Sequence, residues 1–371
     1  MKQNQADDKA YMDLALKLAV RARGRVEPNP MVGAVIVRDG QIVGKGHHRK
    51  FGGPHAEIEA IRNAGGESAC VGATLYVTLE PCCHHGKTPP CTDAIIRSAF
   101  SRVVVAMKDP FSAVRGKGLR LLRQAGISVE TGLLGNDAKE LNAPYIKLRS
   151  RGLPYFIAKW AMSADGKIAT KTGDSKWISS EPSRRLVHRI RSRVDAVMIG
   201  IGTALKDNPE LTCRLASGRN PARIVVDSRA QLSLKSNLVK TARKTRVIVA
   251  VTSRAPAAKV KALEKQGCEI LKCRSDKSGG VNLLALAKKL GNMEFTNVLV
   301  EGGASLFGSL FDRHLIDEVV VFIAPIVVGG NKAVPTVGGE GVRLIKAAAS
   351  LCNLTFKKLG NDMMMRGRVT W

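Results

Sequence analysis

Hydrophobic and polar positions divide the first 130 residues into short helices and strands. An apolar stripe at helical spacing predicts an amphipathic helix over Tyr11–Ala22, which Gly24 would end. Two alternating runs, Val32–Val37 and Gln41–Gly46, flank Asp39-Gly40 and predict a β-hairpin. Further helices are expected at 56–64, 91–99 and 118–124, and further strands at 74–78, 102–106 and 127–130. This order indicates a hairpin followed by alternating helices and strands.

The pattern is interrupted near 149–154, where Gly152 and Pro154 predict a domain boundary. Beyond it, runs rich in Val and Ile are candidate strands, at 155–160, 194–199, 224–227, 247–251, 298–300 and 319–323. Nearly continuous apolar runs that alternate with helices are typical of a mostly parallel sheet covered on both faces. The 371 residues suit two α/β domains, which we place at 1–150 and 151–371.

The charge is strongly basic. Residues 1–150 hold 22 basic and 14 acidic residues, and 151–371 hold 37 and 17, so the two parts carry +8 and +20 of the net +28. Such a balance suits nucleic acid, phosphate-bearing small molecules, or a plain solvated surface. Aromatic residues make up only 4%, which leaves few platforms for stacked bases. We therefore expect phosphorylated small molecules, and no nucleic acid, as partners.

The location expected from the sequence is the cytoplasm. No apolar run approaches the ~20 residues of a membrane span, and the first ten residues are polar and mixed in charge, unlike a secretory or transit signal. The eight cysteines lack the regular framework of a secreted disulfide protein. The sequence leaves open whether the chain forms a homo-oligomer.

Candidate zinc chemistry gathers around His55, Cys82 and Cys91. An imidazole and two thiolates are good zinc ligands, and three protein ligands leave the fourth position to water. The metal lowers the pKa of that water, which gives a nucleophile near neutral pH. Glu57, two residues after His55, could move the proton from the water to a departing amine. His-x-Glu followed by Pro-Cys-x-x-Cys is the signature of zinc nucleobase deaminases.

The match to that signature is incomplete, because eight residues separate Cys82 from Cys91. Cys83, His84 and His85 lie in this gap and are rival ligands. One alternative is a structural zinc with four protein ligands, which would leave Glu57 without a task. Another is a set of ordinary buried thiols without metal.

The motif from Pro81 to Cys91, PCCHHGKTPPC, resembles that of the bifunctional riboflavin-biosynthesis deaminase–reductase family. Asn29-Pro30-x-Val32-Gly33 and Pro54-His55-Ala56-Glu57 resemble its other N-terminal motifs, although Cys83 stands where the family more often has Ser. The resemblance implies a cytidine-deaminase-like α/β/α domain with one zinc per chain, the ligand set above and Glu57 as its catalytic residue. It also implies a substrate site lined by Asn29, His48, Lys87 and Asp109. Otherwise Asn29 and Asp109, each followed by a proline, would be surface or turn residues.

Motifs in the second half are similar to the same family. They are Lys159–Ala169, Ser175–Ser179, Asp207–Arg214, Val226–Ser228 and Glu301–Leu306. The resemblance implies a dihydrofolate-reductase-like α/β domain that uses NADPH. For the substrate it implies Lys159, Ser175, Arg191, Leu211, Arg214 and Glu301. For the cofactor it implies Ala161, Trp177, Thr203, Asp207, Ser228, Gly303, Ala304, Ser305 and Leu306.

The residues of this half carry a weaker signal by themselves. Gly302-Gly303 follows a predicted strand and opens a helix, a place suited to a pyrophosphate or simply to a turn. Gly200-Ile201-Gly202 lacks the third glycine of a Rossmann fingerprint, so a Rossmann domain is not expected. Trp177 could stack on the cofactor or fill the core. Arg191 and Arg214 could bind the substrate phosphate or belong to an exposed basic face.

The activity implied by the resemblance has two steps. The first deaminates 2,5-diamino-6-(ribosylamino)pyrimidinone 5′-phosphate, and the second reduces the ribosyl group of the resulting aminouracil to ribityl with NADPH. Two other interpretations stay open: an RNA-editing deaminase, such as a transfer-RNA adenosine deaminase with a basic RNA-binding half, and a zinc-stabilised nucleic-acid-binding module without catalysis. The long gap before Cys91 and the Glu301-Gly302-Gly303 segment argue against the RNA-editing enzyme.

Overall fold

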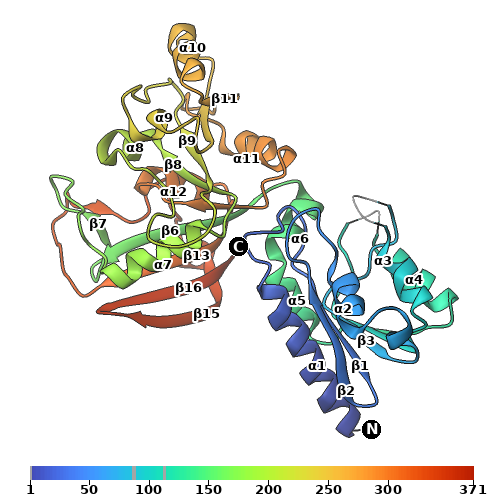
Figure 1. The fold of residues 1–371 in the computed structure, drawn as a ribbon. Coiled ribbons are helices and arrows are strands. Elements are labelled where there is room, and N and C mark those ends of the chain that lie inside the picture. Colours follow the sequence, from blue (N-terminus) through green and yellow to red (C-terminus); the bar gives the residue numbers. More distant parts are fainter. Residues whose placement is uncertain (1, 86–88, 112–113) are drawn as a thin grey trace. The chain divides into compact units, whose positions relative to one another are not determined.

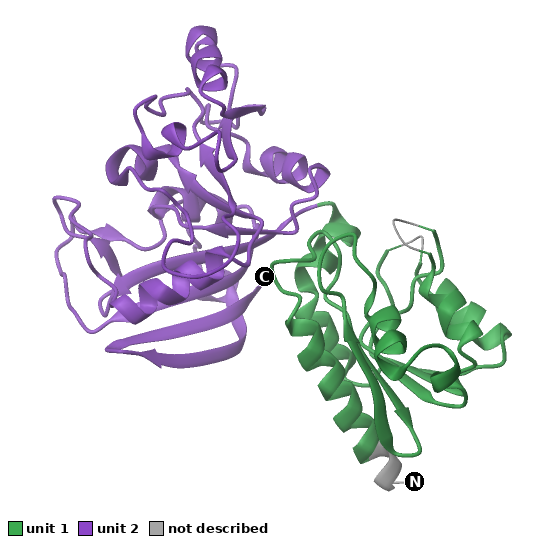
Figure 2. Ribbon diagram, in the orientation of Figure 1, with its two compact units in different colours: residues 1–152 green, residues 153–371 purple. Residues whose placement is uncertain are grey.

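The chain divides into two units, Met1–Gly152 and Leu153–Trp371, which Figure 2 shows in green and purple. The structure is a computed structural model that describes residues 2–85, 89–111 and 114–371. Both units are mixed α/β, and each has its own sheet and its own core. They are described separately below.

The first unit is built on a five-stranded sheet of order β2-β1-β3-β4-β5 (Figure 1). Its strands are β1 (Gly33–Arg38), β2 (Gln41–His47), β3 (Thr74–Val77), β4 (Arg102–Val105) and β5 (Ser128–Thr131). β1 pairs antiparallel with β2 and β3, whereas β3, β4 and β5 run parallel. The hairpin and the alternating arrangement expected from the sequence are thus confirmed.

Helices cover both faces of this sheet. They are α1 (Lys2–Val20), α2 (Ala56–Ala64), α3 (Cys91–Arg97), α4 (Lys117–Gln124), α5 (Gly135–Leu141) and α6 (Ala143–Arg151). A Cβ atom on Gly33 would lie 2.0 Å from the Ala15 carbonyl oxygen of α1, and one on Gly46 would lie 2.2 Å from the Ala56 carbonyl oxygen of α2. Gly46 pairs with Ala34, the neighbour of Gly33. Because successive strand residues face opposite sides, α1 and α2 pack on opposite faces and form an α/β/α sandwich.

The second unit has a nine-stranded sheet of order β11-β10-β9-β8-β12-β6-β13-β16-β15. Its strands are β6 (Tyr155–Ser163), β8 (Ala196–Gly200), β9 (Ala222–Val226), β10 (Val247–Val251), β11 (Glu269–Lys272), β12 (Asn297–Val300), β13 (Ile316–Ala324), β15 (Ser350–Leu359) and β16 (Asp362–Thr370). The strands from β11 to β13 run parallel, and β16 and β15 continue the sheet antiparallel. A separate two-stranded sheet pairs β7 (Lys167–Ala169) with β14 (Val334–Pro335).

Two hydrophobic clusters lie on the two faces of this larger sheet. Along β8, Ala196 and Met198 belong to one cluster and Val197 and Ile199 to the other, as the period of two in a strand requires. The helices are α7 (Glu181–Arg191), α8 (Ile201–Asp207), α9 (Asn237–Lys240), α10 (Ala257–Lys265), α11 (Leu283–Asn292) and α12 (Ala304–Phe311). Residues of α11 and α12 pack in the first cluster, and residues of α9 and α10 pack in the second.

Some elements differ from those expected. The first helix begins at Lys2, well before Tyr11, and α6 runs through Arg149 where an interruption was expected. The β15–β16 hairpin was not expected, because β15 exposes most of its residues and shows no apolar run. None of the helices in the described part of the chain combines the length and the hydrophobicity that crossing a lipid bilayer requires.

Candidate functional site

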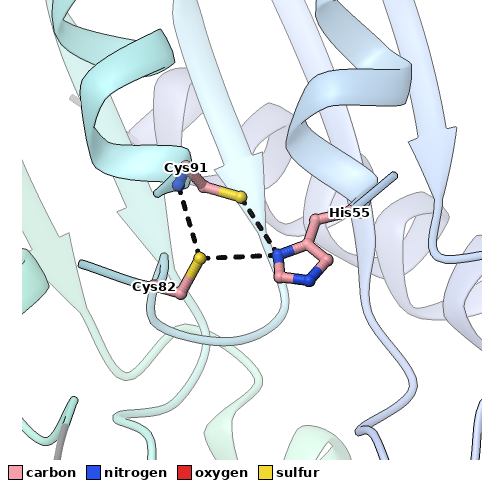
Figure 3. A group of neighbouring side chains, drawn as sticks. All are labelled: His55, Cys82 and Cys91. Atoms are coloured by element: carbon pink, nitrogen blue, oxygen red, sulfur yellow. Dashed lines mark hydrogen bonds between the residues drawn. The ribbon is translucent and has the colours of Figure 1, made fainter. Parts of the chain in front are cut away.

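Three side chains of the first unit converge as the zinc pattern predicts (Figure 3). His55 immediately precedes α2, Cys91 is the first residue of α3, and Cys82 lies in the loop after β3. The His55 Nδ1 atom lies 3.2 Å from the Cys91 sulfur and 3.4 Å from the Cys82 sulfur. The set is therefore assembled from two helix starts and one strand end.

These distances fit a zinc ion. Bonds of about 2.3 Å to sulfur and about 2.0 Å to nitrogen, at tetrahedral angles, place the two donor atoms about 3.5 Å apart. Among the described residues, His55, Cys82 and Cys91 form the group whose ligand atoms lie close enough together, within 4.8 Å, to hold a metal ion. Cys83, His84 and His85 do not join this group, so the four-ligand structural zinc gains no support.

The electrostatics of this group favour a thiolate at Cys82. A hydrogen bond from the Cys91 thiol lowers the pKa of Cys82 to about 4, and His55 adds to the effect. The same hydrogen bond, together with burial, raises the pKa of Cys91 well above its ordinary value. The backbone amide of Cys91 also donates to the Cys82 sulfur over 3.3 Å.

Glu57 lies in the first turn of α2, next to this group. Its side chain is buried, and burial raises the pKa of its carboxyl group, which the neighbouring His55 opposes. It is not part of the converging ligand group, but it lines the same cavity as His55 and Cys82. A buried carboxyl group beside a metal site can accept and return a proton during a reaction.

A cavity of about 260 Å³ is lined by two members of the triad, His55 and Cys82. Of the residues expected at the substrate site, Asn29, His48 and Asp109 line it. The Asn29 amide nitrogen lies 3.2 Å from His48 Nε2, and His48 Nδ1 lies 2.9 Å from the Pro54 carbonyl oxygen. Lys87 lies outside the described residues. The sequence therefore predicted residues that the fold brings to one cavity from separate parts of the chain.

Asp109 is held by a small buried network. Its carboxyl group accepts a hydrogen bond from the Phe111 amide at 2.8 Å and from the Tyr145 hydroxyl at 3.0 Å. Burial raises the pKa of Asp109, whereas these two donors and the charge of Arg149 oppose the rise. Of the alternative that Asp109 is a surface or turn residue, the surface part is wrong, because Asp109 is only 6% exposed, whereas its bond to the Phe111 amide two residues on is a turn contact.

Glu80 organises the wall of the cavity beside Cys82. Four backbone amides donate to its side-chain oxygens, from Asp109 at 3.2 Å, Gly116 at 3.0 Å, Gly118 at 3.1 Å and Leu119 at 3.5 Å. A Cβ atom on Gly118 would lie 2.3 Å from the Pro81 carbonyl oxygen, so this close approach requires glycine. Glu80 thus fastens the start of α4 and the backbone of Asp109 to the loop that carries Cys82.

We predict that Glu80→Gln destabilises the first unit by about 1–3 kcal/mol, because a glutamine NH₂ group would face amide donors that then lack an acceptor. The effect is measured by monitoring ammonia release at increasing urea concentrations, and it should appear as a lower urea concentration at half-inactivation. Glu67→Gln is the matched control, since Glu67 forms an exposed ion pair with Arg97, which is worth little. Equal midpoints for the two variants would show that the Glu80 network is unimportant.

A buried group of three charges lies in the second unit, where β12 ends. The Glu301 carboxyl oxygens contact Arg191 Nε at 2.6 Å and Lys159 Nζ at 3.0 Å. Burial raises the pKa of Glu301, but the two cations outweigh burial and hold that pKa far below its ordinary value. The alternative that Arg191 belongs to an exposed face is wrong, because its side chain is 12% exposed.

The turn after β12 lies beside α8. Gly303 precedes α12 as its N-cap, and a Cβ atom on it would lie 3.6 Å from the Thr203 hydroxyl oxygen. The Leu306 side chain is buried against Gly200 and Gly302, so it faces the core. Because β12 lies between β8 and β6, these residues gather at the carboxyl ends of neighbouring parallel strands, where α/β proteins bind ligands.

The other residues expected in this half come from several elements and loops of the second unit. Trp177 is 67% exposed, with the Arg184 guanidinium 4.6 Å from its ring centroid. The alternative that Trp177 fills the core is therefore wrong. Leu211 is buried, whereas Arg214 is half-exposed and pairs with Glu210. Ala161 lies on β6, and Asp207 is the last residue of α8. Ala304 and Ser305 begin α12, and Ser175 and Ser228 lie in loops.

Sequence reasoning missed Glu80, Tyr145 and Arg149 as parts of the first site. Glu80 directly precedes Pro81-Cys82, and a carboxyl group so close to a metal motif was a usable signal. Tyr145 and Arg149 lie on α6, in a stretch where no helix was expected, yet both line the cavity. Nothing in their local pattern connects them with residues more than thirty positions earlier.

Two family models match the chain. The one described as "RibD C-terminal domain" matches residues 154–365, and "Cytidine and deoxycytidylate deaminase zinc-binding region" matches residues 5–107. The riboflavin biosynthesis protein RibD of Aquifex aeolicus is 41% identical over 96% of this chain and 97% of its own length. The riboflavin biosynthesis protein RibD of Escherichia coli is 39% identical over 87% of this chain and 89% of its own length.

Solved structures agree with these matches. The structure of a Thermotoga maritima diaminohydroxyphosphoribosylaminopyrimidine deaminase/5-amino-6-(5-phosphoribosylamino)uracil reductase is 37% identical. The match covers 99% of this chain and 100% of the Thermotoga maritima chain, with a TM-score of 0.84. Acinetobacter baumannii RibD, form 1, is 35% identical with the same coverage and a TM-score of 0.86.

Proposed function

Because the chain belongs to the RibD family of bifunctional deaminase–reductases of riboflavin biosynthesis, we propose that it catalyses two successive reactions on one aminopyrimidine ribotide. The first unit deaminates 2,5-diamino-6-(ribosylamino)pyrimidinone 5′-phosphate. The second unit reduces the ribosyl group of the product to ribityl with NADPH. The observation that carries the proposal is the joining, in one chain, of the His55–Cys82–Cys91 group to the reductase unit. The match over nearly the whole chain favours this function over RNA editing.

The deaminase step is a hydrolysis in which Glu57 moves the proton. Water adds to the ring carbon that carries the amino group, Glu57 takes a proton from this water and passes it to the amino nitrogen, and ammonia leaves. Its burial beside the cavity keeps the carboxyl group out of bulk water. Asn29, His48 and Asp109 present polar groups to the same cavity and would orient the ring.

Zinc would be held by His55, Cys82 and Cys91 and, when bound, supplies a Lewis acid that lowers the pKa of a coordinated water. The starts of α2 and α3 fix two of these ligands, and the strand end before Cys82 fixes the third. Glu80 supports the third ligand through its bonds to the neighbouring loop. The chain therefore contributes a preformed ligand set together with a separate proton carrier.

In the reductase unit, the Lys159–Glu301–Arg191 group would meet the substrate. These charges lie where β6 and β12 run side by side, and Glu301 starts the turn that leads to Gly303. Amides at the start of α12 suit the pyrophosphate of a dinucleotide, which supplies the hydride. Thr203, beside Gly303, would contact the same cofactor. Ser175, Leu211 and Arg214 are proposed for the substrate, and Ala161, Trp177, Asp207 and Ser228 for the cofactor.

We predict that NADPH is used with a higher kcat/KM than NADH, and that Arg229→Gln reduces this preference roughly tenfold. Arg229 is exposed just after β9, and β9 lies two strands from β12, about 10 Å along the sheet edge. An Arg there could bind the 2′-phosphate of NADPH. Steady-state reduction with each cofactor measures the ratio. Arg254→Gln, which changes an exposed Arg after β10, is the control, and an unchanged ratio in Arg229→Gln would contradict the assignment.

The function itself is tested by incubating the full-length protein with zinc, the diaminopyrimidine ribotide and NADPH. Mass spectrometry should first find the product in which an amino group is replaced by oxygen, and then the same product with two added hydrogens. Omitting NADPH should stop the sequence after the first product. Failure to release ammonia from the ribotide would contradict the proposed deaminase activity.

We propose that the basic surface serves phosphorylated small molecules and no nucleic acid. Support comes from the low aromatic content and from the family membership. A reducing, cytoplasmic compartment suits the enzyme, because Cys82 and Cys91 must stay reduced to bind zinc as thiolates.

A further inference from the structure

The cavity of the first unit has an unusual balance of charge for a site that takes a phosphorylated substrate. Among the described residues that line it, Glu57, Glu80 and Asp109 carry carboxyl groups. Arg149 is the one Lys or Arg side chain among those same lining residues. A dianionic phosphate entering next to these acids needs a compensating positive charge, because like charges at close range repel.

Arg149 is held in a defined orientation at this cavity. It lies in the last turn of α6, and its guanidinium carbon is 5.4 Å from the Phe111 ring centroid and 5.6 Å from the Tyr145 ring centroid. Both rings line the same cavity. Tyr145 in turn donates to Asp109, so the network that fixes Asp109 also fixes the platform under Arg149. Contacts with two rings place the planar guanidinium at the cavity wall before any ligand arrives.

We propose that Arg149 binds the 5′-phosphate of the ribotide in the deaminase site and makes this site selective for the phosphorylated substrate. The inference rests on the proposed function and deepens it. A guanidinium presents several N–H donors in one plane and pairs with phosphate through two parallel hydrogen bonds. The Phe111 and Tyr145 rings position the donor, and Asp109 keeps Tyr145 in place.

The test compares two substrates that differ only in the phosphate: the diaminopyrimidine ribotide and the corresponding ribonucleoside. Ammonia release by the zinc-loaded, full-length protein is measured with each. For Arg149→Gln we expect kcat/KM on the ribotide to fall roughly 10- to 100-fold, mostly through KM, while kcat/KM on the ribonucleoside stays within about twofold. Arg149→Lys keeps the charge but loses the planar pairing, so it should recover part of the loss.

Arg151→Gln is the matched control, because Arg151 is exposed in the same helix turn and does not line the cavity. It should leave both substrates unaffected. An equal loss on both substrates in Arg149→Gln would assign Arg149 a purely structural role and overturn the proposal. The proposal would also be overturned if Arg149→Gln kept the full preference for the ribotide over the ribonucleoside while Lys87→Gln lost it. If the unchanged protein releases no ammonia from either substrate, the proposed function fails and this inference fails with it.

Discussion

Glu57→Gln is expected to abolish ammonia release while zinc stays bound. Glutamine keeps the size of the side chain in its buried position in the first turn of α2, but it cannot accept and return a proton. Loss of a general acid–base group slows a reaction by about 10²- to 10⁴-fold. The measurement is ammonia release from the ribotide, together with the zinc content of the same preparation.

Two controls separate this result from a general loss of structure. Reduction of the already deaminated substrate by NADPH should be unchanged, because we assign this step to the second unit. Glu59→Gln changes a carboxyl group on the same helix that pairs with Arg49 and Arg62, and it should retain deaminase activity. Ammonia release near the normal rate in Glu57→Gln would remove Glu57 from the mechanism.

The second large effect concerns the metal. Cys91→Ser should lose its zinc on dialysis and with it the deaminase activity, whereas Cys83→Ser should keep one zinc per chain. The Cys91 sulfur is fully buried and belongs to the converging group, while Cys83 does not. A serine hydroxyl does not ionise near neutral pH, so it is a poor substitute for a thiolate ligand. Metal analysis after dialysis gives the stoichiometry directly.

The two cysteine variants control for each other, because they make the same chemical change at positions only eight apart in the sequence. Both should retain reduction of the deaminated substrate. Zinc lost from Cys83→Ser and kept in Cys91→Ser would show that the ligands are wrongly assigned. If both variants keep their zinc, the structural-zinc alternative, in which His84 or His85 is a ligand, is favoured instead.

Local sequence was sufficient wherever an element or a ligand is defined by its immediate neighbours. Asp39-Gly40 between two alternating runs predicted the β1–β2 hairpin, and the Val-rich runs predicted the parallel strands of the second unit. His55, Cys82 and Cys91 were identified because each belongs to a short motif at a strand end or a helix start. By contrast, β15 is an exposed edge strand with little hydrophobic pattern, so it gave no local signal.

Long-range packing decided the surroundings of both sites. The bonds from Glu80 to the Asp109–Leu119 backbone, and the placement of Arg149 over Phe111, join segments whose separation no local period encodes. In the second unit Arg191 and Glu301 are 110 residues apart in sequence and become neighbours because β12 inserts between β8 and β6.

The sequence by itself therefore determined most of the elements of the two sheets and the zinc-ligand group, because hydrophobic period and motif spacing act over a few residues. Only the tertiary structure decided that Arg191 is buried against Glu301, that Trp177 is exposed, and that Arg149 reaches the deaminase cavity. Burial and the identity of a distant partner depend on strand order and helix packing. These are fixed by the free energy of the whole core, to which each residue contributes only a small part.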